Sequence, residues 1–259
     1  MTEILNQLSG LIADNSDVFW TGFLVFLRVG AAIALMPAFG ETVVPQRVRL
    51  MAALAFTAIV APAVVRDGLL PQEGSAQSAF SEVVIGLALG FGMRMFILAL
   101  QIAGNVVAQA TSLSQVFGGA TPEPQPAIGN LLVIAGLALA VMSDFHVKAA
   151  TLLIESYAIL PLGQIPKPAD MSNWGLSQIA NGFSLAFSLA APFVIASLIY
   201  NIALGVINRA MPQLMVTFVG APALTAGGLI LLVLVAPLAL VVWQAEFSRF
   251  LGAAFLISR

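Results

Sequence analysis

The fold of this chain is decided by residues 82–91, which read E-V-V-I-G-L-A-L-G-F. They open an apolar segment, residues 83–110, that holds a single charge, Arg94, and is long enough to cross about 30 Å of hydrocarbon as a helix. Gly86 and Gly90 lie four residues apart, and small residues at this spacing let two helices approach closely. The stretch therefore predicts a membrane helix that packs tightly on a neighbouring helix.

The same apolar character extends over the whole chain of 259 residues. Apolar residues make up 60% of it, and charged residues make up 8%, against about 25% in soluble domains. A water-soluble surface cannot be built from so few charges, so the bilayer is the natural solvent. Long apolar intervals with few or no charges predict six helical segments, at residues 18–38, 50–65, 83–110, 130–141, 170–209 and 209–246. We expect an all-α membrane protein built from hydrophobic helical hairpins.

Proline and glycine mark the expected breaks in these helices. Because proline lacks a backbone donor, Pro192, Pro222 and Pro237 predict kinked or broken helices in the last two segments. Prolines also predict a surface loop at residues 161–170. The loop at residues 112–129 lies between two membrane segments, and irregular backbone at membrane depth must be buried in protein or line an aqueous cavity. It is a candidate gate or plug, with a plain external loop as the alternative.

Most chemistry is excluded by what the sequence lacks. It has no cysteine, so disulfides, thiolate nucleophiles and cysteine-ligated metals are ruled out. The net charge of −2 and the absence of a basic run argue against nucleic acid. Nucleotide-binding, zinc-protease and serine-hydrolase motifs are missing. We therefore expect no catalytic residue, cofactor or metal. Asp144 and His146 are expected to orient or cap a helix. The N-terminus lacks the basic region of a signal peptide, so residues from Met1 onward are expected in the mature protein.

Two arginines lie inside apolar segments, where a cation needs a carboxylate, carbonyl groups or water. Arg28 and Arg94 are these cations. One interpretation is that each supports a packing contact between subunits or a water-filled pathway. The alternative is that both side chains snorkel to the membrane interface or pair with a neighbour, and Glu82 is a candidate partner for Arg94 only through a long reach along the helix. Four methionines are candidates for a flexible apolar seal, with ordinary packing as the alternative: Met93, Met95, Met211 and Met215.

Three stretches, in order along nearly the whole chain, resemble the FliR family of flagellar export-gate proteins, which has counterparts in virulence injectisomes. The most specific is N-R-x-x-P-Q-L at residues 208–214, within residues 201–220. The second is residues 27–50, which carry Arg28, Pro37, Pro45, Arg47 and Arg49 in the expected register. The third is residues 82–91, followed by the loop that begins at Ser112.

The resemblance implies a single FliR-type domain over residues 1–259. Residues 1–170 would be FliP-like and contain the plug loop near 112–129, and residues 171–259 would form a FliQ-like closing hairpin. The implied plug residues are Ser112, Leu113, Ser114, Gln115, Val116, Phe117, Gly118 and Gly119. The implied assembly residues are Arg28, Pro45, Arg47, Arg94, Asn208, Arg209, Pro212 and Gln213.

The resemblance also implies a non-enzymatic subunit of a hetero-oligomeric export gate. It would assemble with FliP-like and FliQ-like chains into a pore for unfolded flagellar proteins, in the bacterial inner membrane at the flagellar basal body. Energy would come from an export ATPase and an FlhA-like component, and an FlhB-like protein would dock near the entrance. The alternatives are the equivalent injectisome subunit and a stand-alone small-solute transporter with its site beside Arg28 or Arg94.

Overall fold

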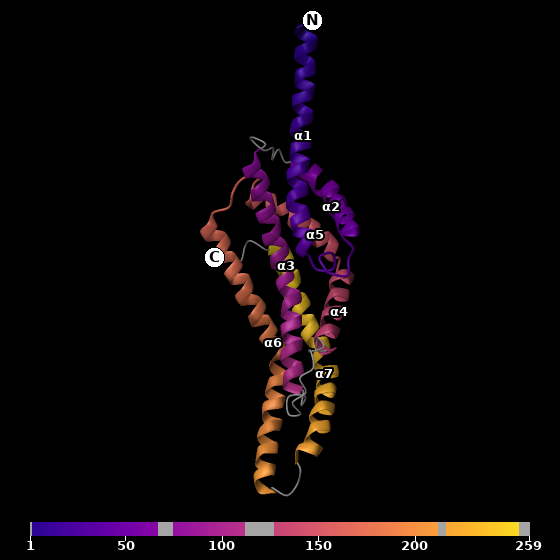
Figure 1. The fold of residues 1–259 in the computed structure, drawn as a ribbon, viewed down its shortest axis with the longest axis vertical. Coiled ribbons are helices and arrows are strands. Elements are labelled where there is room, and N and C mark those ends of the chain that lie inside the picture. The colour runs from indigo at the N-terminus through magenta and orange to yellow at the C-terminus, as the bar shows by residue number, and fades with distance from the viewer. Residues whose placement is uncertain (1, 67–74, 112–126, 212–215, 254–259) are drawn as a thin grey trace. The chain divides into compact units, whose positions relative to one another are not determined.

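A computed structural model of the chain describes residues 2–66, 75–111, 127–211 and 216–253. Within these ranges the secondary structure is helical and contains no strand, which confirms the predicted all-α class (Figure 1). The helices are α1 (Thr2–Leu35), α2 (Gln46–Arg66), α3 (Ala76–Thr111), α4 (Ala127–Met142), α5 (Phe145–Ile159), α6 (Pro168–Ala210) and α7 (Val216–Ala253). Each predicted apolar segment lies largely on one of these helices.

Four of the described helices are long and apolar enough to cross a membrane. They are α2, α3 over Ala76–Ala110, α6, and α7 over Ala226–Ala253. Helices α4 and α5 meet the same test only as a pair bent by 73°, and the apolar part of α1, Phe19–Leu35, is shorter. The chain is therefore a membrane protein by the length and composition of its helices. Its described residues contain four such spans, or five if the bent pair is one span, where the sequence predicted six.

The predicted interruptions at proline are not found in α6 or α7, and the predicted kinks stay a prediction. Helix α6 continues through Pro192, and α7 continues through Pro222 and Pro237. A proline inside a helix removes one backbone hydrogen bond, and a helix in an apolar environment keeps its other bonds because no water competes for them. The connector predicted at residues 161–170 is confirmed up to residue 167, because α6 begins at Pro168. Proline is favourable at the first position of a helix, since the backbone N–H that it lacks would have no hydrogen-bond partner within the helix there.

The chain divides into two compact units that interleave along the sequence. The first comprises Met1–Arg94, Ser143–Gln178 and Arg249–Arg259, and the second comprises Met95–Met142 and Ile179–Ser248. Helices α3, α6 and α7 each contribute to both units. The division into a FliP-like and a FliQ-like part at residue 170 rests on family likeness and stays a prediction.

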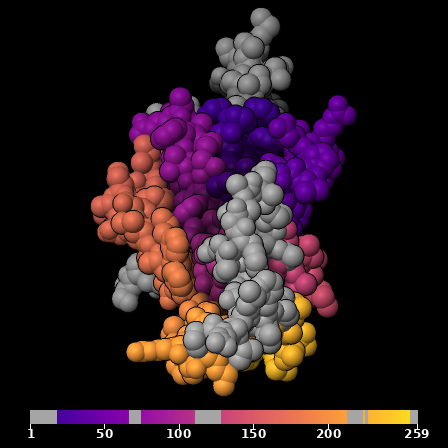
Figure 2. Space-filling model, turned by 60° about the horizontal axis from the view of Figure 1, so that its bottom comes forward, coloured from indigo at the N-terminus to yellow at the C-terminus, as the bar shows by residue number. Residues whose placement is uncertain are grey.

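The first unit is built on a close contact between α1 and α3, with α2 and α5 beside them (Figure 1). Gly86 lies against the backbone carbonyl of Arg28, and Gly90 lies against that of Ala32. A side chain at either glycine would collide with α1, so the predicted small-residue packing is confirmed. The space-filling view shows the indigo atoms of α1 and α2 beside the purple atoms of α3 (Figure 2).

The second unit uses a similar contact between α3 and α4. Gly104 lies so close to Gly129 that a β-carbon on Gly104 would collide with the backbone of α4. Trp243 of α7 is fully buried, and its Nε1 donates a 2.8 Å hydrogen bond to the carbonyl oxygen of Phe96 on α3. The Phe247 ring lies 5.1 Å from the Phe96 ring and 5.2 Å from the Trp243 ring, measured between centroids. An aromatic cluster thus joins α3 and α7 within this unit.

We predict that Gly86→Ala destabilises the protein, whereas Gly30→Ala does not. Alanine favours helix over glycine by about 1 kcal/mol at both positions. At Gly86 the new methyl group meets the Arg28 carbonyl, and such overpacking costs about 1–3 kcal/mol. At Gly30 the corresponding space is open.

Thermal unfolding of the purified protein in detergent measures the difference. Gly86→Ala is expected to lower the midpoint temperature and Gly30→Ala to keep or raise it. Equal shifts for the two variants would contradict the packing argument.

Candidate functional site

A buried ion pair connects α1 to α3 in the first unit. Arg28 and Glu82 are both fully buried. The arginine Nε donates to Glu82 Oε2 at 2.6 Å, and Nη2 donates to Glu82 Oε1 at 3.1 Å. This two-point contact matches the planar guanidinium to the carboxylate and is the strong form of such a pair. It also confirms that Arg28, inside the predicted apolar segment 18–38, has a charged partner.

The remaining contacts of the pair reach α5 and the connector after it. Arg28 Nη1 donates to Ser156 Oγ at 3.0 Å, and Nη2 donates to the Leu160 carbonyl oxygen at 2.9 Å. The Arg28 guanidinium carbon also lies 3.8 Å from the centroid of the Tyr157 ring. The backbone N–H of Gly163 donates to Glu82 Oε1 at 2.8 Å. We call Arg28, Glu82, Ser156, Tyr157 and Gly163 the arginine cluster.

The arginine cluster is a positioning device. Its cation is enclosed by a carboxylate, a hydroxyl, a carbonyl and an aromatic face, so the buried charge is well compensated. Gly163 adopts a left-handed backbone, with φ of 76°, and a β-carbon there would press on Ser78 of α3. That tight turn aims the Gly163 N–H at Glu82. The cluster therefore fixes three helices and the start of the connector to α6 at one point.

The second interior arginine has a more exposed partner. Arg94 Nη1 donates to Glu41 Oε1 at 2.6 Å, and the two side chains are 24% and 23% exposed. Arg49 Nη2 donates to the Glu41 carbonyl oxygen at 3.0 Å, which holds the turn between α1 and α2. The predicted pairing of Glu82 with Arg94 is wrong, because twelve residues separate them along α3, about 18 Å, and Glu82 pairs with Arg28 instead.

The other residues expected from the resemblance do not join a common site in the described part of the chain. Pro45 and Arg47 are exposed at the beginning of α2, and Asn208 and Arg209 are exposed at the end of α6. Pro212, Gln213 and the predicted plug, residues 112–119, lie outside the described residues. Their roles stay predictions.

The predicted capping role of Asp144 is only partly right. Asp144 precedes α5 in a left-handed conformation, with φ of 57°, but its side chain makes no capping hydrogen bond. Its carbonyl oxygen instead accepts from the backbone N–H groups of Val147 and Lys148, as the first turn of a helix requires. His146 is exposed on that turn.

The four methionines differ in their surroundings, and the seal stays a prediction. Met93 and Met95 are buried, as ordinary packing requires, whereas Met211 is exposed. Met215 lies outside the described residues. Among the described residues, no group of three or more histidine, cysteine, aspartate or glutamate side chains is placed to hold a metal ion.

Sequence reasoning missed Ser156, Tyr157 and Gly163 as partners of the buried pair. Ser156 lies 128 residues from Arg28, and no pattern in the sequence aligns α5 with α1. One signal was available for Glu82, because it stands four residues before Gly86 and so on the same face of α3. A carboxylate on the face that packs against α1 is a natural partner for the cation of α1.

The fold and the enclosed arginine cluster define an all-helical membrane protein whose polar groups position helices. Residues 19–250 match the family described as bacterial export proteins, family 1. This chain belongs to that family. It is 33% identical to the flagellar biosynthetic protein FliR of Caulobacter vibrioides, over 88% of this chain and 93% of the relative. It is also 29% identical to the FliR proteins of Escherichia coli, over 83% and 84% of the two chains, and Bacillus subtilis, over 90% and 92%.

We predict that Glu82→Gln is strongly destabilising and that Glu41→Gln is nearly neutral. Glutamine keeps an acceptor for the Gly163 N–H but leaves the Arg28 charge buried and uncompensated, at a cost of about 3–5 kcal/mol. The Arg94–Glu41 pair is partly exposed, and such pairs contribute about 0–1 kcal/mol.

Protein level in membranes and the unfolding midpoint in detergent compare the two variants. A second substitution, Arg28→Met in the Glu82→Gln background, is expected to recover part of the loss because it removes the stranded charge. Similar destabilisation by Glu82→Gln and Glu41→Gln would refute this account of the cluster.

Proposed function

We propose that this chain is a structural and gating subunit of the flagellar protein export gate, in which it assembles with FliP-like and FliQ-like chains to form the channel for unfolded flagellar proteins. Membership of the export-protein family over residues 19–250 supports this proposal, as do the names of the FliR relatives. The gate lies in the bacterial inner membrane at the flagellar basal body, and FlhA-like and FlhB-like proteins adjoin it.

The observation that carries the proposal is the apolar exposure of α6 and α7 in the second unit. In the most apolar 18-residue stretch of α6, only 17% is buried within the chain. In the corresponding stretch of α7 the buried share is 6%. Large apolar side chains are exposed along both helices, among them Leu198, Ile199, Ile202, Val206, Leu229, Val233, Leu234 and Leu238. A chain with so much uncovered apolar surface needs lipid or neighbouring helices around it, as a subunit of a membrane assembly does.

The subunit would act by placing helices around a conduit, and it would catalyse no reaction. The arginine cluster would keep α1, α3 and α5 rigid while the apolar faces contact sister subunits. The plug residues 112–119 would close the conduit at rest, and partner proteins would supply the energy. Each of these roles follows from family likeness combined with the positioning character of the buried polar groups.

The two alternatives differ in their support. A stand-alone transporter would need a solute site beside its interior cations, but the donors of Arg28 bind to groups of the chain itself in an enclosed setting. The equivalent injectisome subunit has the same chemistry, and gene neighbourhood separates it from the flagellar protein, since the two sets of export genes form separate clusters. The flagellar names of the relatives favour the flagellar gate.

Deletion of the gene tests the proposal directly. We expect the deletion strain to assemble no filament and to secrete no hook protein, because the conduit lacks one of its walls. Secretion of hook protein into the culture medium is measured by immunoblotting, and a plasmid copy of the gene is expected to restore it. A motile, fully secreting deletion strain would overturn the proposal.

A second prediction concerns the end of α6. Arg209→Ala is expected to reduce recovery of the FliP-like and FliQ-like chains when this chain is purified, because an exposed cation at the end of a long apolar helix fixes a contact with a partner. Arg66→Ala, at the exposed end of α2, is the matched control and should leave recovery unchanged. Equal recovery with both variants would remove Arg209 from the assembly surface.

A further inference from the structure

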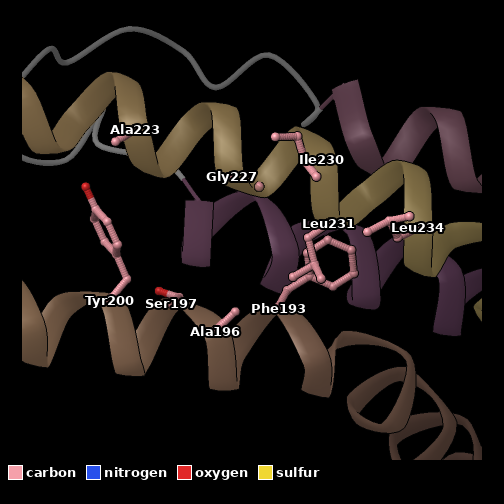
Figure 3. A pocket seen from close by; sticks show the side chains of 10 residues that line it. Phe193, Ala196, Ser197, Tyr200, Ala223, Gly227, Ile230, Leu231 and Leu234 are labelled. Atoms are coloured by element: carbon pink, nitrogen blue, oxygen red, sulfur yellow. The ribbon is translucent and has the colours of Figure 1, made fainter.

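A cavity of about 270 Å³ lies between α6 and α7 in the second unit (Figure 3). Small residues face it from both helices, which leaves the space between the two backbones unfilled. Its lining comprises Phe193, Ala196, Ser197 and Tyr200 of α6 with Ala223, Gly227, Gly228, Ile230, Leu231 and Leu234 of α7. We call this space the hairpin pocket.

The hairpin pocket is apolar along most of its length. Phe193 and Leu231 lie together near one end, where Leu234 also stands, and Tyr200 stands at the other end near Ala223 (Figure 3). Ser197 is nearly buried, and its Oγ already accepts a 3.2 Å hydrogen bond from Asn201 Nδ2. Apolar cavities of this kind do not hold ordered water, because water needs two to four polar partners. A ligand that fits this lining is therefore a hydrocarbon group rather than water.

The size and setting of the pocket identify that group. A water molecule takes up about 30 Å³ of liquid, and a methylene group is of similar size, so the pocket holds a chain of roughly nine such groups. One turn of a helix, about 10 Å across and 5.4 Å long, fills roughly 420 Å³ and so exceeds the volume of the pocket. Both walls belong to helices apolar enough to span a membrane, with apolar side chains such as Ile230 and Leu234 exposed at the pocket itself. Lipid acyl chains are the abundant hydrocarbon around such helices.

We propose that the hairpin pocket binds one acyl chain of a membrane phospholipid, which fills the gap between α6 and α7 and braces the hairpin. The phenol of Tyr200 stands at one end of the bound chain, as aromatic side chains with a polar tip commonly do at the edge of hydrocarbon. This proposal concerns the hairpin alone and does not depend on the proposed export function.

Two glycines provide a matched pair of variants. A β-carbon on Gly227 meets no atom within 4 Å, so Gly227→Leu places its side chain in open space at the pocket lining. Gly205 of α6 has the same open surroundings but does not line the pocket, so Gly205→Leu is the control. Ala196→Leu fills the pocket from the opposite wall and serves as a second test if Gly227→Leu is poorly recovered.

The experiment labels the full chain in its own bacterial membranes with a phospholipid that carries a diazirine on one acyl chain. After irradiation and purification, peptide mapping locates the crosslinks. We expect labelling of residues 193–200 and 227–234 to fall several-fold in Gly227→Leu and in Ala196→Leu, and to stay unchanged in Gly205→Leu. Labelling that none of the pocket variants reduces would overturn the proposal. Labelling of the chain expressed alone, but not in cells with the whole export apparatus, would assign the pocket to a partner's side chain and would also overturn it.

Discussion

The structure of the first unit depends on placing one cation, Arg28, inside an apolar helix. An isolated charge there would cost several kcal/mol, and the fold compensates it with the Glu82 carboxylate, the Ser156 hydroxyl and the Leu160 carbonyl. Those three acceptors come from α3, α5 and the residue that follows α5. Because all of them must converge on one guanidinium group, the relative positions of α1, α3 and α5 are specified far more narrowly than apolar contacts alone would specify them. Apolar contacts between helices allow one helix to shift along the other in an apolar environment. The hydrogen bonds of a guanidinium group have fixed directions, so the same shift would break them.

The ion pair and the glycine contacts both depend on the same face of α3. Glu82, Gly86 and Gly90 recur at intervals of four residues and so face α1 together. The glycines bring the α3 backbone against the carbonyl groups of Arg28 and Ala32, and that approach carries the short Glu82 side chain within reach of the guanidinium. Hydrophobic burial contributes little to helix association where the surroundings are as apolar as the side chains, so close packing and interhelical hydrogen bonds have to supply the stability. One face of α3 provides both.

The helices could be predicted from the sequence because apolar length and charge spacing fix them locally. The predicted segments lie on the observed helices, and the glycine contact follows from the spacing of Gly86 and Gly90. Apart from Glu82, whose place on the glycine face of α3 was a usable signal, the partners of the interior arginines could not be predicted, because they depend on how helices distant in sequence are aligned. Glu82 lies 54 residues from Arg28, and Glu41 lies 53 residues from Arg94. Proline interrupts neither α6 nor α7, because in an apolar setting the loss of one hydrogen bond leaves the remaining bonds to hold the helix together.

The arginine cluster of the first unit and the α6–α7 hairpin of the second meet their packing needs differently. In the first, the buried polar groups of the arginine cluster find partners within the chain, so its helices are held from inside. In the second, α6 and α7 carry large exposed apolar residues such as Ile199 and Val233, and small residues leave the hairpin pocket between them. An unfilled apolar gap forfeits dispersion contacts on both walls, so the gap is well packed only when hydrocarbon supplies the missing atoms. The buried polar groups of the first unit therefore need no outside partner, whereas the exposed apolar side chains of α6 and α7 need apolar surroundings.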